Sequence, residues 1–265
     1  MEAGRAGGRV TTVLLYHDVV PADERDASGF PGPLAARYKL DPGLFEAHLA
    51  AVSATGIGVG VLAPGEGLPP AAFTFDDGGA SSLAAAELLE RCGWRGHFFI
   101  ASAFIGRQGF LGAAELRSLA ERGHVVGSHS HSHPTYMGRL DPEAIEREWT
   151  ESRARLADVL GEPPLLASLP GGFLSRSVLA GAARAGYRML MTSEPSTRPR
   201  SSDGLLAVGR FAIWSTTPAS RAAAYVAGSR WARSQLWLEW HAKDTAKRIS
   251  PAAYQALRKV RARRA

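Results

Sequence analysis

Short apolar runs alternate with longer amphipathic stretches along most of the chain. Runs rich in β-branched and aromatic residues are typical of buried strands, and Ala/Leu/Glu/Arg-rich stretches that stop at glycine are typical of helices. The runs predict strands at residues 10–16, 71–75, 96–101, 124–127, 165–169, 187–192 and 206–213. The amphipathic stretches predict helices at residues 41–54, 81–92, 113–122, 141–160 and 175–185.

This alternation predicts parallel strands joined by helical crossovers. About seven strands favour an α/β fold with a single (β/α) barrel, resembling a TIM barrel, over two small domains. We expect the barrel to occupy residues 1–215 and a helical extension to occupy residues 216–265. In such barrels the chemistry lies at the carboxyl ends of the strands.

Composition excludes several classes of protein. Hydrophobic residues make up 45% of the 265 residues, which is enough to form a core and excludes disorder as the main state. The single cysteine, Cys92, excludes a disulfide framework and a zinc site built from cysteines. No apolar run approaches the roughly 20 residues of a membrane span. The first apolar run stops at His17, too early for a signal peptide, and this predicts a cytoplasmic protein.

Positive charge is concentrated at the C-terminal end. The chain has a net charge of +6, but residues 221–265 hold 11 Lys and Arg against Glu239 and Asp244. The remainder is slightly acidic, so a nucleic-acid partner is disfavoured. Tryptophans accompany the basic residues, and a final helix is predicted at residues 251–264. Residues 231–265 either pack their tryptophans on the barrel or make a peripheral membrane contact with anionic lipid.

Two adjacent carboxylates, Asp76 and Asp77, follow a predicted buried strand and precede Gly78. Adjacent residues at a strand end point in different directions. One carboxylate is therefore able to bind a metal while the other acts as a base. A solvated Asp-Gly turn is the alternative.

A cluster of histidines follows a later strand. His129, His131 and His133 lie within five residues and are followed by Pro134. One turn of helix would bring His129 and His133 to the same face. Because neutral imidazole is a common zinc ligand, this spacing indicates metal binding. A third and weaker motif, Pro170–Gly172, follows the next strand and is able to present a backbone N–H to an oxyanion.

Together and in this order, the three motifs resemble those of the polysaccharide deacetylase family, the NodB-homology carbohydrate esterases of family 4. The resemblance runs from about residue 10 to residue 213. It implies a NodB-type barrel and a metal-dependent hydrolase that removes an N-linked acetyl group from an amino sugar in a glycan or glycoconjugate.

The resemblance also implies a role for each matching residue. Asp76 would be the general base, and Asp77, His129 and His133 would bind Zn²⁺, in a site that also accepts Co²⁺, Ni²⁺ or Mn²⁺. Gly171 and Pro170 would lie beside the oxyanion and the N-acetylated sugar.

The chain departs from the family pattern at several positions. Ser168 replaces the arginine of the third motif, and Gly171 replaces its aromatic residue. The late histidine that supplies the general acid is missing. The first predicted strand ends in Tyr16-His17, which resembles the circularly permuted subgroup that deacetylates poly-N-acetylglucosamine. The first and last strands of a closed barrel are neighbours, so this resemblance implies that His17 is the acid. Arg210 is a candidate for the missing arginine that orients the base.

Two alternatives to the deacetylase stay open. One is another metal-dependent amidohydrolase, in which His129 and His131 would bind the metal. The other is a catalytically impaired glycan-binding protein with a NodB-like fold, which the missing arginine and late histidine favour.

Overall fold

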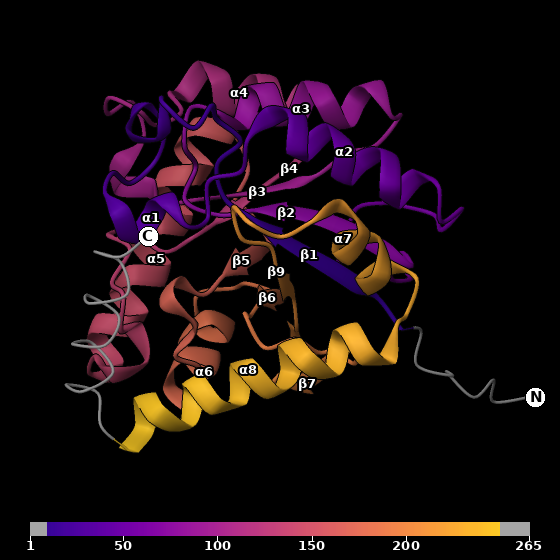
Figure 1. Cartoon of the computed structure of the whole chain (residues 1–265). Coiled ribbons are helices and arrows are strands. Elements are labelled where there is room, and N and C mark those ends of the chain that lie inside the picture. Colours follow the sequence, from indigo (N-terminus) through magenta and orange to yellow (C-terminus); the bar gives the residue numbers. More distant parts are fainter. Residues whose placement is uncertain (1–9, 250–265) are drawn as a thin grey trace, which may run out of the picture.

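A computed structural model describes residues 10–249 as a curled, mostly parallel sheet surrounded by helices (Figure 1). Each strand and helix predicted between residues 10 and 213 is present with ends shifted by a few residues, except that the run at residues 206–213 forms two strands. The strands are β1 (Thr12–Tyr16), β2 (Ala71–Phe75), β3 (His97–Ile100), β4 (Val125–Ser128), β5 (Leu166–Ser168), β6 (Met189–Met191), β7 (Arg200–Ser202), β8 (Leu205–Val208) and β9 (Phe211–Ala212). The α-helices are α1 (Pro33–Ala36), α2 (Pro42–Ser53), α3 (Ser82–Arg91), α4 (Ala113–Glu121), α5 (Pro142–Leu160), α6 (Arg176–Arg184), α7 (Ala219–Val226) and α8 (Arg230–Ile249).

One bent segment closes the sheet into a barrel. Strands β1 to β6 lie side by side in sequence order, and all of their pairings are parallel. Strand β8 pairs with β6, and β9, which follows after only two residues, pairs with β1 on the other side of the sheet. The segment β8–β9 therefore acts as the seventh strand, and the prediction of a barrel with about seven strands is confirmed. Its bend lies at Gly209 and Arg210, where a Cβ on Gly209 would come within 2.5 Å of the Glu194 carbonyl oxygen.

Two helices, α2 and α5, begin at Asp-Pro pairs, as predicted. The carboxylate of Asp41 accepts hydrogen bonds from two backbone amides of α2, and that of Asp141 accepts one from Ala144 at 2.7 Å. These bonds satisfy amides that have no partner within the helix. Strand β7 was not predicted, because it is a short polar strand that pairs antiparallel with β8 and is largely exposed.

The barrel interior is filled by apolar side chains from most of the strands. This cluster includes Val13, Ala72, Phe99, Leu166, Met189 and Val208. The guanidinium of Arg210 lies above it, 5.8 Å from the centre of the Phe99 ring. The polar group of Arg210 thus lies directly on a buried apolar layer.

Helices α7 and α8 pack against the barrel. Ala222, Tyr225 and Val226 of α7, with Ala232 and Leu236 of α8, belong to the same apolar cluster as β1 and β2. The division at residue 215 stays a prediction, and the helix predicted at residues 251–264 lies outside the described residues. No helix between residues 10 and 249 combines the length and hydrophobicity needed to span a membrane.

Candidate metal centre and active site

The polar residues of the three motifs meet at the carboxyl end of the barrel, as predicted. His17 follows β1, Asp76 and Asp77 follow β2, and His129 follows β4. Ser168 is the last residue of β5. Because parallel strands end at the same edge, residues far apart in the sequence share one site.

Asp77, His129 and His133 form the one group within residues 10–249 whose ligand atoms are arranged to hold a metal together. Their ligand atoms all lie within 4.8 Å of one another. Oδ1 of Asp77 is 3.3 Å from Nε2 of His133 and 3.5 Å from Nε2 of His129. That oxygen is buried and has no hydrogen-bond partner in the described part of the chain.

This geometry fits a divalent metal ion. Two ligands about 2.0–2.1 Å from a tetrahedral ion lie about 3.3–3.4 Å apart, close to the two distances from Asp77 Oδ1. Nδ1 of His129 donates to the Ser168 carbonyl at 3.0 Å, which leaves Nε2 without a proton and able to bind a metal. A metal ion would also satisfy the otherwise unpartnered Oδ1 of Asp77.

The histidines converge through a loop and not through a helix, so the prediction of a helical turn at residues 129–133 was wrong. Ser130 and His133 have positive φ values of 64° and 59°, which cannot continue a right-handed helix. Asp77 also has a positive φ, of 76°. Three of the four non-glycine residues with positive φ between residues 10 and 249 therefore lie in this site. Such conformations persist where the surrounding structure imposes them, often at functional sites.

Electrostatics hold Asp77 and His129 in metal-binding protonation states, whereas the neighbouring Asp77 carboxylate raises the pKa of His133 and favours its protonated form. Burial lowers the pKa of His129 to about 4, so its imidazole is neutral at neutral pH. Burial alone would raise the pKa of Asp77, but His133, His17 and His129 outweigh this effect and hold it well below its usual value. The site thus offers one carboxylate and at least one neutral imidazole.

Asp76 is held by a buried ion pair with Arg210. The two guanidinium nitrogens donate to the two carboxylate oxygens at 2.7 and 2.8 Å, and only 1% of Arg210 is exposed. Burial alone would raise the pKa of Asp76, but Arg210 and then His129 outweigh it and lower the pKa. Ser168 joins the pair, since its Oγ donates to Asp76 and accepts from Arg210. Arg210 thus lies where it orients Asp76, although its contribution to catalysis stays a prediction.

His17 lies near both carboxylates. It is half-buried, and it is close enough for its charge to lower the pKa of Asp76 and of Asp77. Its ring packs against Tyr38 with the ring centres 4.6 Å apart. Nδ1 of His17 is buried without a hydrogen-bond partner among the described residues. The first strand therefore brings a histidine to the site, and its role as the acid stays a prediction.

Gly171 and Pro170 lie in a short turn directly after β5. A Cβ on Gly171 would come within 2.0 Å of the Thr135 carbonyl oxygen, and its φ is 65°. This contact leaves no room for a side chain at this position. The part that Gly171 and Pro170 play toward an oxyanion or sugar stays a prediction.

His131 points away from the metal ligands. Its Nδ1 lies 2.9 Å from Ser102 Oγ, and its Nε2 faces Glu151 at 3.7 Å. This geometry disfavours the alternative in which His129 and His131 bind the metal. His241, the one histidine that follows His133 in the sequence, lies on α8, where its Nδ1 is 2.9 Å from the Trp237 carbonyl oxygen.

Several residues that support the site were not predicted. Glu148 of α5 accepts hydrogen bonds from the backbone amides of His131 and Ser132, and so fixes the histidine loop. Phe30 packs on the ring of His133 at 4.6 Å. Both contacts join segments that are distant in sequence, and no local pattern marks them.

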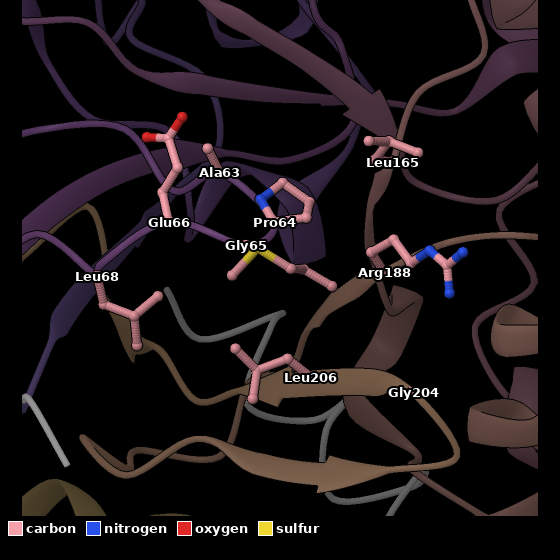
Figure 2. A pocket seen from close by; sticks show the side chains of 10 residues that line it. Ala63, Pro64, Gly65, Glu66, Leu68, Leu165, Arg188, Gly204 and Leu206 are labelled. Atoms are coloured by element: carbon pink, nitrogen blue, oxygen red, sulfur yellow. The ribbon is translucent and has the colours of Figure 1, made fainter. Parts of the chain in front are cut away.

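A separate cavity of about 460 Å³ lies at the opposite end of the barrel (Figure 2). It is lined by residues that precede or begin β5, β6 and β8, including Leu165, Arg188 and Leu206, and by the segment before β2. The candidate active site is at the carboxyl ends of the strands, so this cavity is not part of it.

Residues 66–190 match the sequence model of the polysaccharide deacetylase family. Among curated proteins, YxkH of Bacillus subtilis, whose name assigns it provisionally to the polysaccharide deacetylases, is 26% identical over 155 residues. That match covers 58% of this chain and 55% of YxkH. The peptidoglycan-N-acetylglucosamine deacetylase of Bacillus cereus is 27% identical over 124 residues, which cover 46% of this chain and 55% of that enzyme. The chain thus spans about half the length of the curated relatives that it matches.

A solved structure shares the fold. The polysaccharide deacetylase BC0361 from Bacillus cereus superposes with a TM-score of 0.67 at 20% identity, over 83% of this chain and 69% of that one. This likeness shows a NodB-like distorted barrel. Together the comparisons support the polysaccharide deacetylase family, most directly for the segment that carries Asp76, Asp77, His129 and His133.

Proposed function

We propose that this protein is a metal-dependent carbohydrate N-deacetylase, which hydrolyses the acetamide of an N-acetylated amino sugar in a glycan or glycoconjugate. The observation that carries the proposal is the unpartnered Oδ1 of Asp77, which faces Nε2 of both His129 and His133. An amino-sugar substrate is supported by the name of the Bacillus cereus relative, which deacetylates N-acetylglucosamine in peptidoglycan.

The residues around this triad suit amide hydrolysis. A divalent ion, with Zn²⁺ as our first choice, would supply Lewis acidity that lowers the pKa of water and polarises an acyl carbonyl. Asp76, kept ionised by Arg210, accepts the proton of the attacking water. His17 donates a proton to the amine as it leaves. An acid and a base on one acyl carbon are what hydrolysis of an unreactive amide requires.

The position of His17 also supports a closer relationship with the circularly permuted poly-N-acetylglucosamine deacetylases. Strand β1, which precedes His17, pairs with β9, the last strand. A histidine at the end of the first strand therefore lies where a late strand would otherwise place the acid histidine. This placement favours an enzyme over the glycan-binding protein that lacks an acid.

Metal-stripped protein is expected to release no acetate from N-acetylglucosamine oligomers, and added Zn²⁺ or Co²⁺ is expected to restore release. Acetate is measured by a coupled enzymatic assay, and bound metal by mass spectrometry. The matched control is His17→Ala, which keeps all three metal ligands and is expected to bind metal without turnover. Metal binding by the wild-type protein without acetate from any N-acetylated sugar would favour the glycan-binding alternative.

We also propose that the outer face of α8 makes a peripheral contact with anionic lipid. Trp231, Trp237 and Leu238 are 64%, 45% and 60% exposed. Arg230 directly precedes Trp231 and is exposed, and residues 221–265 hold 11 Lys and Arg in all. Exposed tryptophan beside basic residues is suited to the interface of an anionic membrane.

The double substitution Trp231→Ser/Leu238→Ser is expected to weaken binding to vesicles that contain phosphatidylglycerol by about tenfold, because it removes the apolar insertion surface. Sedimentation with vesicles measures binding, and pure phosphatidylcholine vesicles test the need for anionic lipid. Leu165→Ser, which changes an apolar side chain exposed to 42% at the opposite end of the barrel, is the control. Equal binding by wild type and double variant would exclude this contact.

A further inference from the structure

A buried ion pair lies beside the candidate active site and plays no part in the proposed reaction. Asp18 directly follows His17, and Lys39 directly follows Tyr38, whose ring packs on the ring of His17. Nζ of Lys39 is 3.9 Å from Oδ2 of Asp18, and the side chains of Lys39 and Asp18 are only 2% and 3% exposed. Each charged residue is thus the neighbour of one of the two packed rings.

Stability alone is a weak reason for this pair. Burial raises the pKa of Asp18 and lowers the pKa of Lys39, so the charged form of each is disfavoured where it lies. Moving two charges out of water costs free energy that their mutual attraction does not always offset. The contacts around the pair indicate a different role, which is to hold neighbouring loops together.

The carboxylate of Asp18 joins the end of β1 to the loop that follows β2. Its Oδ1 accepts hydrogen bonds from the hydroxyl of Ser28 and, at 2.8 Å, from the hydroxyl of Ser81. The Ser81 hydroxyl in turn accepts from the backbone amide of Val19 at 3.0 Å. Helix α3 begins directly after Ser81, but this hydroxyl makes no capping bond to the helix. Ser81 therefore connects the two loops and does not stabilise the start of α3.

Two glycines leave room for this carboxylate. A Cβ on Gly79 would lie 2.0 Å from Oδ1 of Asp18, and a Cβ on Gly29 would lie 2.3 Å from Oδ2. Gly79 follows the proposed metal ligand Asp77 by two residues. The carboxylate of Asp18 therefore packs directly on the backbone of the metal-binding loop.

Lys39 holds the segments on the other side of the pair. Its Nζ donates to the backbone carbonyls of Arg25 and Ser28. The backbone amide of Leu40 donates to the Asp18 carbonyl at 2.9 Å. The pair and its hydrogen bonds thereby fix the two backbone segments that carry the packed rings.

The ring of His17 depends on these segments for its position. His17 follows the last residue of β1, and its Nδ1 is buried without a hydrogen-bond partner among residues 10–249. Packing on Tyr38 and the backbone that carries the ring therefore orient the imidazole. A displacement of about 1 Å is enough to lower a catalysed rate about 100-fold.

We propose that Asp18, Lys39 and Ser81, the acid-loop clamp, are positioning residues that hold the imidazole of His17 beside the leaving group of the substrate. This inference rests on the proposed function, in which His17 protonates the departing amine. The clamp does not touch the substrate, and it acts through the backbones on either side of the two packed rings. Its loss therefore slows a reaction that needs the acid and spares one that does not.

The test compares two acetylated substrates that differ in their need for an acid. The amine of an N-acetylglucosamine oligomer leaves only with a proton, whereas 4-nitrophenyl acetate releases a stable phenolate without one. Ser81→Ala is expected to lower kcat for the oligomer about tenfold, with KM and bound metal unchanged, and Asp18→Ala about 100-fold. For the ester, kcat of both variants is expected to stay within about twofold of wild type.

Thr55→Val is the matched control. The Thr55 hydroxyl also makes two backbone hydrogen bonds, donating to the Val52 carbonyl and accepting from the Ile57 amide. It lies just after α2, which runs from the carboxyl end of β1 toward the start of β2, so it is distant from the site. The control is expected to keep kcat for both substrates. An equal fall of kcat for oligomer and ester in Ser81→Ala would overturn the proposal, as would no fall for either.

A spectroscopic measurement separates this inference from the proposed function. In protein with isotope-labelled histidine, the ring signals of His17 are identified by their loss in His17→Ala. Ser81→Ala is expected to shift these signals, while Thr55→Val leaves them in place. Shifted signals in a protein that releases no acetate would support the clamp and count against the deacetylase. Unshifted signals, together with metal-dependent acetate release, would overturn the clamp and leave the proposed function intact.

Discussion

Asp76→Asn is expected to lower the rate of acetate release by about 10²–10⁴-fold while the protein still binds its metal. Asparagine keeps the shape of aspartate, and its oxygen still accepts hydrogen bonds from Arg210 or Ser168. An amide cannot take a proton from water, so the proposed base is lost. The metal ligands are different side chains, and Nε2 of one of them, His129, is 3.8 Å from Asp76 Oδ2.

The matched comparison is His129→Ala, which is expected to lose both metal and turnover. Metal content is measured by mass spectrometry after dialysis against a trace of Zn²⁺, and turnover by acetate release. The two neighbouring carboxylates would then have separate roles, with Asp76 for proton transfer and Asp77 for metal binding. Near-normal turnover by Asp76→Asn, or loss of its metal, would contradict this division.

Much of the fold could be predicted because its local patterns agree with its final structure. The apolar run at residues 71–75 is β2, and the Asp-Pro pair at residue 141 begins α5. The run at residues 206–213 was predicted as a single strand, whereas the structure divides it into β8 and β9 at Gly209 and Arg210. The bend lets one segment pair with both β6 and β1, and pairing at this distance leaves no periodic signal in the sequence.

The same limit applies to the site. The motifs around Asp76 and His129 mark candidate residues because they follow strands, and the fold of a barrel brings strand ends together. The partner of Asp76 is harder to recognise, since Arg210 lies 134 positions later. Ser168 stands where the third motif has an arginine. Its Oγ donates to Asp76 and accepts from Arg210. The arginine of the family motif is thus absent from one strand, while an arginine from another reaches the same carboxylate.

Arg210→Met is expected to destabilise the protein by about 3–5 kcal/mol, because it leaves the carboxylate of Asp76 buried without its counter-charge. Asp76 is only 4% exposed, and Ser168 alone cannot replace two guanidinium bonds. The folded state lowers the pKa of Asp76, so the ion pair contributes fully at neutral pH and is lost as the pH falls through that lowered value. Urea unfolding at neutral pH, in chelator so that metal binding does not contribute, measures the change.

The double variant Arg210→Met/Asp76→Asn distinguishes this cause from a general loss of packing. Asparagine carries no charge, so removing Arg210 in its presence is expected to cost less than removing Arg210 from the wild type. A double-mutant cycle gives the coupling between the two side chains, which we expect to be favourable by about 1–3 kcal/mol. If the two effects simply add, the ion pair does not hold Asp76, and the buried guanidinium serves only to fill space above Phe99. A favourable coupling, with turnover lost in every variant of the cycle, would instead identify Arg210 as the residue that positions the base.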